Sequence, residues 1–239
     1  MENKKKIIGM VLIIILIIAL IAVTILYNNF SETQLNLLTE ESNKLIQQDL
    51  INEEIDEEIK TQKDYAVVEK TIKEYLSNIK NIYLEMENLN SKINADEIFS
   101  ASNVQDHKFN NVDPLIEEIR EKSKEYLEQC KTLIGEDKIK EAINSVQFST
   151  PIPNRREYYI NLYNTVMLSD TMKSQLTKIE ESVEQSKDNL YDKFSVLSKI
   201  KTHLEENARY WNVKDDKIVF TNANIMVEYY DLINELNSK

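Results

Sequence analysis

The sequence predicts an all-α protein in which a single N-terminal transmembrane helix precedes an elongated, antiparallel helical bundle with coiled-coil-like seams. Three observations support this prediction. The 239 residues include only two glycines and three prolines, too few for the turns of a β sandwich or a nucleotide-binding α/β fold. One long apolar run lies near the N-terminus. After it, apolar residues recur at steps of three and four, which is typical of helices that bury one face.

The apolar run covers residues 7–27 and contains no charged residue. A helix of this length spans about 31 Å, which matches the roughly 30 Å hydrocarbon core of a bilayer. A cleaved signal peptide has a shorter apolar region and a cleavage motif of two small residues separated by one. Here Ala19 and Ala22 stand three positions apart. We therefore expect an uncleaved anchor in contact with membrane lipid.

Charges around the run predict its orientation. Lys4, Lys5 and Lys6 precede it, and residues 28–31 carry no charge. Positive residues stay on the cytoplasmic side, so residues 1–6 are expected to form a short cytoplasmic tip of a single-pass cell-membrane protein, with the remainder extracytoplasmic. The whole chain has a net charge of −12, and such an acidic protein repels nucleic acid phosphates. No nucleic-acid partner is expected.

Residues 28–63 are expected to form either a stalk or the first helix of the bundle. The apolar residues between positions 35 and 59 predict a helix over residues 31–62, and Ser31 with Gln34 has the spacing of a capping box. Five carboxylates fall within residues 53–58. Adjacent helical residues point in different directions, so this run predicts a solvated face rather than a metal site.

The extracytoplasmic bundle is expected to cover residues 64–239. Its clearest helix covers residues 65–93, where nine apolar positions alternate steps of three and four, the pattern of a heptad seam. Residues 94–112 lose this pattern and predict a loop with at most one helical turn. His107, in this loop, is expected to be an ordinary surface residue.

The next helix is expected to begin with Asp113 as its N-cap and Pro114 as its first residue, and to end with Gly135 at the C′ position. Cys130 falls on the apolar face of this helix, which predicts a buried and inert thiol. As the only cysteine, it has no partner for an intrachain disulfide.

The C-terminal half continues the helical pattern. A short helix is expected over residues 137–147, and residues 155–211 form either one long helix or two helices separated near Ser169. Residues 213–220 are the one plausible extended segment, expected to be a connector because an isolated strand is not stable. A last helix follows, with five residues expected to face inward: Ile225, Met226, Tyr229, Ile233 and Leu236.

The sequence holds little that could support catalysis. The two histidines, His107 and His203, and the single cysteine give no triad or zinc-ligand spacing, and no glycine-rich phosphate loop occurs. We therefore expect no enzyme activity, no metal and no cofactor.

Protein contact is the remaining function that the residues favour. Arginine and tyrosine are enriched in binding hot spots, which makes five residues candidates for protein contact: Arg155, Arg156, Tyr158, Tyr229 and Tyr230. The alternative is that the tyrosines pack in the core and that the arginines offset local negative charge. The expected function is a membrane-anchored interaction or scaffold module at the cell envelope, which contacts an envelope protein or itself. A passive spacer, or a ligand-sensing ectodomain that works through a separate membrane partner, is the alternative.

Overall fold

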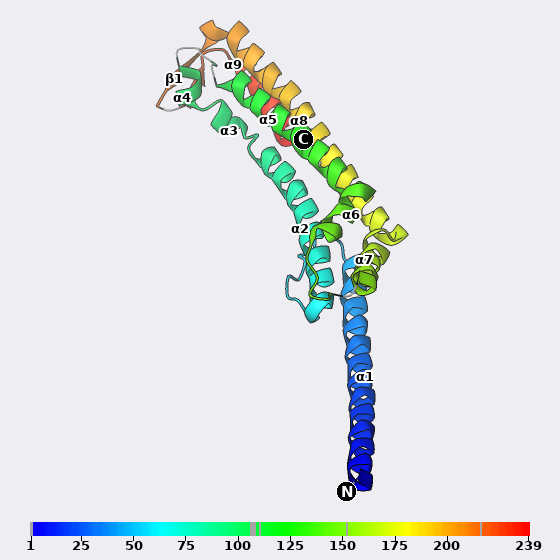
Figure 1. The fold of residues 1–239 in the computed structure, drawn as a ribbon. Coiled ribbons are helices and arrows are strands. Elements are labelled where there is room, and N and C mark those ends of the chain that lie inside the picture. Colours follow the sequence, from blue (N-terminus) through cyan, green and yellow to red (C-terminus); the bar gives the residue numbers. More distant parts are fainter. Residues whose placement is uncertain (1, 106–108, 110, 152, 216) are drawn as a thin grey trace.

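A computed structural model shows one long helix that projects from an elongated bundle (Figure 1). The structure describes residues 2–105, 109, 111–151, 153–215 and 217–239. His107 lies outside the described residues. The chain is mostly helical, as predicted.

The projecting helix is α1, Glu2–Gln47, which runs through the apolar segment without a break. From Ile15 onward it is long and apolar enough to cross a membrane, and its apolar side chains are exposed. No new helix starts at Ser31, because α1 continues through it from the apolar run, which was the alternative to a start at the capping box. Both residues of the predicted capping box make tertiary contacts instead. The Ser31 and Tyr65 hydroxyls lie 2.6 Å apart, and Gln34 Oε1 accepts a hydrogen bond of 2.6 Å from the backbone N–H of Gln62.

The prediction of a helix as far as residue 62 is also wrong. The helix ends at Gln47, and residues 48–62 form a non-helical segment that leads into α2. Side-chain oxygens replace the helical acceptors here: Asp49 accepts from the backbone N–H of Ile51 and of Asn52. Like charges four residues apart in the acidic run also disfavour a helix.

The centre of the bundle consists of three helices that pack against one another: α2, Lys63–Ser91; α5, Val112–Leu133; and α8, Asp170–Glu206. Figure 1 shows them side by side along the long axis. All nine apolar positions predicted to face inward from Tyr65 to Ile93 are buried. Burial of these faces accounts for most of the stabilisation that an amphipathic helix gains in a protein.

The segment between α2 and α5 contains more helix than predicted. It forms two short helices, α3 (Ala95–Ile98) and α4 (Ala101–Val104). The Asn94 side chain caps α3 by accepting a hydrogen bond from the backbone N–H of Asp96. Asp113 is not the N-cap of α5, which begins one residue earlier. Its carboxylate instead accepts a hydrogen bond of 2.5 Å from Lys201 Nζ.

Gly135 separates α5 from α6, Glu136–Ser145. It does not adopt the left-handed conformation of a C′ glycine. Its φ is −64°, and it serves as the N-cap residue of α6. The prediction placed it correctly after the helix but assigned the wrong conformation, because a second helix begins at once.

Residues 153–206 form two helices rather than one: α7, Pro153–Met167, and α8. Ser169 separates them, and its hydroxyl caps α8 by accepting a hydrogen bond of 3.2 Å from the backbone N–H of Met172. The structure thus decides between the two alternatives left open by the sequence.

The predicted connector near residue 213 is in fact a β hairpin. Strands β1 (Trp211–Lys214) and β2 (Lys217–Phe220) pair antiparallel, with Trp211 opposite Phe220. The pairing supplies the partner that an isolated strand lacks. Trp211 is buried and its indole N–H donates to the Leu204 carbonyl at 2.7 Å, which ties the hairpin to the end of α8.

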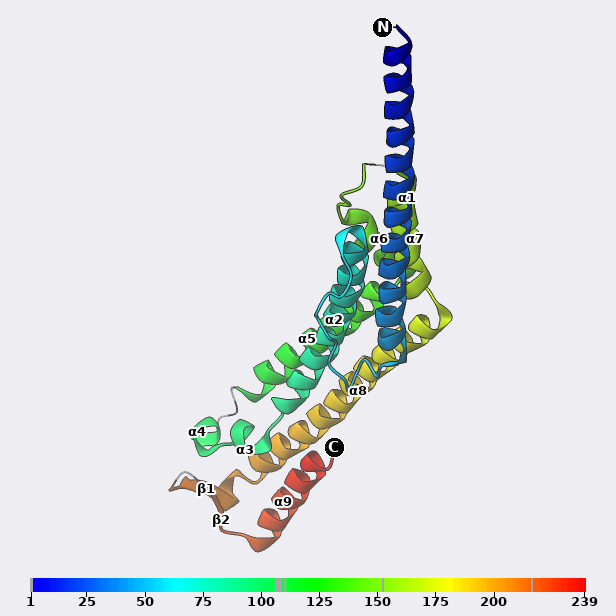
Figure 2. The ribbon, with the colours of Figure 1, turned by 90° about the horizontal axis from the view of Figure 1, so that it is seen from below.

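The last helix, α9 (Ala223–Asn237), returns along α8, as Figure 2 shows. The hairpin and the first turns of α9 therefore lie at the end of the bundle far from the N-terminus. Four of the five residues predicted to face inward are buried or half-buried. Met226 is exposed, so the prediction for that residue is wrong.

Cys130 is completely buried, as its place on the apolar face predicted. Burial raises the pKa of its thiol to about 11, so the reactive thiolate is scarce at neutral pH. We expect no reaction with a thiol-specific disulfide reagent while the protein is folded, and full reaction in denaturant. Rapid labelling of the native protein would contradict the packing of α5.

Candidate functional site

A buried ionic junction joins α1 to the bundle. Lys73 on α2 is only 3% exposed, and its Nζ lies 3.2 Å from Glu41 Oε2 on α1 and 2.8 Å from Glu69 Oε1 on α2. The same ammonium group donates a hydrogen bond of 2.6 Å to the backbone carbonyl of Glu58. One cation therefore connects α1, the segment after it and α2.

The two carboxylates of the junction have further partners. Glu69 accepts hydrogen bonds from the backbone N–H groups of Lys60 and Thr61 and from the Thr61 hydroxyl. Burial alone would raise the pKa of Glu69, but these hydrogen bonds and the one from Lys73 outweigh it and lower the pKa below its ordinary value. The pKa of Glu41 is lowered in the same way: burial opposes ionisation, and Lys44 and Lys73 outweigh it.

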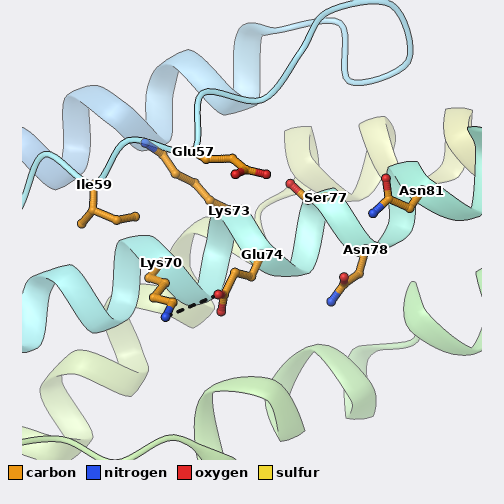
Figure 3. Close-up of a pocket in the computed structure, with 8 residues that line it drawn as sticks. All are labelled: Glu57, Ile59, Lys70, Lys73, Glu74, Ser77, Asn78 and Asn81. Carbon is orange, nitrogen blue, oxygen red and sulfur yellow. Dashed lines mark ion pairs between the residues drawn. The ribbon is translucent and has the colours of Figure 1, made fainter.

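An open groove of about 570 Å³ lies beside this junction on α2 (Figure 3). Two of its lining residues, Lys70 and Glu74, form an ion pair of 3.5 Å, which Figure 3 marks with a dashed line. The remaining lining is mostly polar: Glu57, Ile59, Lys73, Ser77, Asn78 and Asn81. No histidine or cysteine lines this groove, so it offers neither of the usual strong nucleophile or base side chains.

A second feature, which we call the collar, lies where α1 enters the bundle. It consists of Tyr27, Phe30, Lys63, Arg155 and Tyr158. The Arg155 guanidinium lies 4.1 Å from the centroid of the Tyr27 ring, and Lys63 Nζ lies 4.7 Å from that of Phe30. Both rings belong to α1, at and just after the end of its apolar run. Two cations of the bundle thus rest on two aromatic rings of the projecting helix.

Lys63 reaches this position with a strained backbone. Its φ is +54°, in the left-handed region that favours glycine. Asp64, the next residue, is buried, and its carboxylate accepts hydrogen bonds from the N–H and hydroxyl of Ser149 and from the N–H of Thr150. The segment before α7 is thereby attached to the start of α2, so that α7 and α2 each place one cation on a ring of α1.

The five predicted contact residues fall in different places. Arg155 and the exposed Tyr158 belong to the collar, whereas Arg156 donates a hydrogen bond of 3.0 Å to the backbone carbonyl of Asn144. Tyr229 is buried and packs against the Phe220 ring at 5.2 Å. Tyr229 therefore contributes to the core, and of the two tyrosines on α9 only Tyr230, 51% exposed, lies on the surface.

Tyr230 belongs to a third feature, which we call the tip face. It comprises the exposed apolar side chains Met226, Val227 and Tyr230 on α9, and Val219 on the nearby strand β2 is exposed as well. Residues 226 and 227 lie four and three positions before residue 230, so both share a side of the helix with Tyr230.

No known family pattern, curated protein or solved structure matches this chain. The three features therefore have to be interpreted from their own chemistry. Among the side chains that the structure describes, no group of three His, Cys, Asp or Glu residues is placed to hold a metal ion. The junction is a fixed connection, while the collar and the tip face are open to contact with other molecules.

Neither the junction nor the contacts of the collar cations with the Tyr27 and Phe30 rings were predicted. A weak signal for the junction existed in α2, where Glu69 and Lys73 are four residues apart and Lys73 shares a face with Leu76, which broadens the apolar stripe. Glu41, the partner of Lys73, and Tyr27, the partner of Arg155, both lie on α1. No local pattern could have identified them.

Proposed function

We propose that this protein is a membrane-anchored helical scaffold of the cell envelope, whose tip face binds another protein outside the cytoplasm. In this proposal residues 7–27 span the membrane with the N-terminus inside. The lysines before the apolar run support this orientation.

One observation carries the proposal: the large exposed apolar side chains of the described residues gather at the two ends of the molecule. At one end they cover α1 between Ile15 and Leu26, and at the other they form the tip face. Between the ends only Leu84 and Tyr158 belong to this class. An apolar surface in contact with water is costly, so each end is expected to be covered by lipid or by protein.

The junction supports the same proposal. A passive tether needs no defined angle between its anchor and its head, but here a buried lysine fixes α1 to α2. A fixed α1 would hold the tip face at a defined distance and direction from the membrane. This arrangement suits a scaffold that presents a binding surface.

Site-specific crosslinking in living cells tests the proposal. A photoreactive residue replaces Tyr230 in one variant and Glu128, an exposed position on α5, in the other. We expect position 230 to give a discrete adduct with one envelope protein and position 128 to give none. Adding Val227→Asp should abolish the adduct at position 230. Equal adducts at both positions, or none at 230, would contradict binding through the tip face, and adducts with the protein itself would indicate self-association instead.

A further inference from the structure

Within the described part of the chain, the two cations of the collar have no anionic partner. Neither Lys63 nor Arg155 forms an ion pair with any carboxylate among the side chains that the structure describes. Elsewhere the exposed lysines of the bundle commonly pair with a glutamate of their own helix, as Lys122 does with Glu118 at 2.6 Å. In a chain with a net charge of −12, two unpaired cations that lie over rings three residues apart on α1 call for an explanation.

Both cations keep their hydrogen-bond donors available. A cation–π contact occupies the face of a ring and provides no hydrogen-bond acceptor oxygen. Arg155 also lies in the first turn of α7, where the helix dipole adds partial positive charge. A hollow of about 360 Å³ adjoins Arg155, Tyr27 and Tyr158. A guanidinium in such a place can donate two parallel hydrogen bonds to a phosphate group.

The position of the collar indicates which phosphate is within reach. Tyr27 is the last residue of the apolar run, and tyrosine is enriched where hydrocarbon meets headgroups. Phe30 lies three residues further along α1, about 4.5 Å along the helix axis. If residues 7–27 span the membrane, Lys63 and Arg155 therefore lie at the level of the outer headgroups.

We propose that Arg155 and Lys63 bind the phosphate of a phospholipid headgroup in the outer leaflet. This inference rests on the proposed membrane span. The bound phosphate would complete the charge balance of the collar and hold the base of the bundle against the membrane surface. The tip face would then be oriented by two contacts, the junction within the protein and the collar on the lipid.

Native mass spectrometry of the full-length protein, purified in a maltoside detergent that contains no phosphate, tests this proposal. The probe is short-chain phosphatidylglycerol. We expect the wild type to retain one lipid, and the double variant Arg155→Gln, Lys63→Gln to bind it about tenfold more weakly. The matched control is Arg209→Gln, because Arg209 also lies over a tyrosine ring, Tyr210 at 4.6 Å, but stands two residues before β1, which is at the far end of the molecule. This control should bind the lipid as the wild type does.

Three results would overturn the proposal. The double variant could retain the lipid as well as the wild type does. A phosphate-free glycolipid could bind equally well, which would show that the acyl chains alone are recognised. Inorganic phosphate could displace the lipid at equal concentration, which would indicate a site for free phosphate. Alkaline carbonate extraction of the wild type and the double variant distinguishes these failures from failure of the anchor: both proteins stay in the membrane if the span is correct, whatever the collar binds.

Discussion

Lys73→Met is expected to lower the free energy of unfolding by about 3–5 kcal/mol, the usual cost of removing one partner from a buried ion pair. Without the lysine, Glu41 and Glu69 remain buried and lose the cation that they share. Methionine retains much of the unbranched aliphatic stem, which limits the loss of packing. Urea unfolding of the full-length protein in maltoside micelles measures the change. The emission of Trp211, the only tryptophan and a buried one, reports the loss of structure.

Lys70→Met is the matched control. Lys70 lies one turn earlier on α2 and pairs with Glu74 at 3.5 Å, but it is 62% exposed. An exposed pair contributes about 0–1 kcal/mol, so this variant should unfold almost as the wild type does. Adding Glu41→Gln and Glu69→Gln to Lys73→Met should recover part of the lost stability, because no buried charge then lacks a partner. Equal losses in the two lysine variants would contradict the burial of the junction.

Acid is expected to weaken the same junction. The pKa values of Glu41 and Glu69 are below their ordinary value of 4.5 in the folded protein, so the unfolded chain binds more protons near that pH. Their contribution to stability is therefore fully present above pH 4.5 and is lost as the pH falls through the lower, folded values. Urea midpoints measured across this range should fall more steeply for the wild type than for Glu69→Gln. Parallel curves would contradict the assignment of the acid response to the junction.

The second large effect concerns the apolar run. Replacing Leu16 and Leu20 together by aspartate should prevent stable membrane insertion, because each charge near the centre of a membrane helix costs about 2.5–3.5 kcal/mol. Both leucines are exposed in the structure, so the bundle should still fold. Alkaline carbonate extraction of the membrane fraction measures the result. We expect the wild type in the pellet and the double variant in the supernatant or degraded.

The control for this experiment places the same charges just outside the run. Asn28→Asp with Asn29→Asp adds two carboxylates at exposed positions beyond Tyr27. This variant should remain in the pellet, since its charges lie in the headgroup region. Retention of the Leu16→Asp, Leu20→Asp variant in the pellet would show that α1 associates with membranes by some means other than spanning them.

Apolar periodicity was sufficient to place the main helices of the bundle. All nine positions that the spacing from Tyr65 to Ile93 placed inward are buried. These predictions succeed because a helix buries residues according to its own period, whatever the identity of its neighbours.

The predictions that were wrong or missing concern segments that are held by contacts with residues outside the segment itself. The chain leaves the helix at Gln47, and the later part of the segment that follows is held by Glu69, whose carboxylate accepts from the N–H groups of Lys60 and Thr61. The hairpin was missed because each strand has four residues and is stable only through the other, with Trp211 inserted beside α8. In the collar, Arg155 was a candidate for contact with another protein, and its aromatic partner Tyr27 within the chain was missed because it lies more than a hundred positions earlier.

The most direct test of the account is the orientation of the chain in intact cells. Asn3→Cys and Ser238→Cys are made separately and treated with a membrane-impermeant maleimide, while the buried Cys130 stays unreactive in both variants. We predict that Ser238→Cys is labelled on intact cells and that Asn3→Cys is labelled only after the membrane has been permeabilised. Labelling of Asn3→Cys on intact cells, or protection of Ser238→Cys until the cells are opened, would contradict a bundle held outside the cytoplasm by α1.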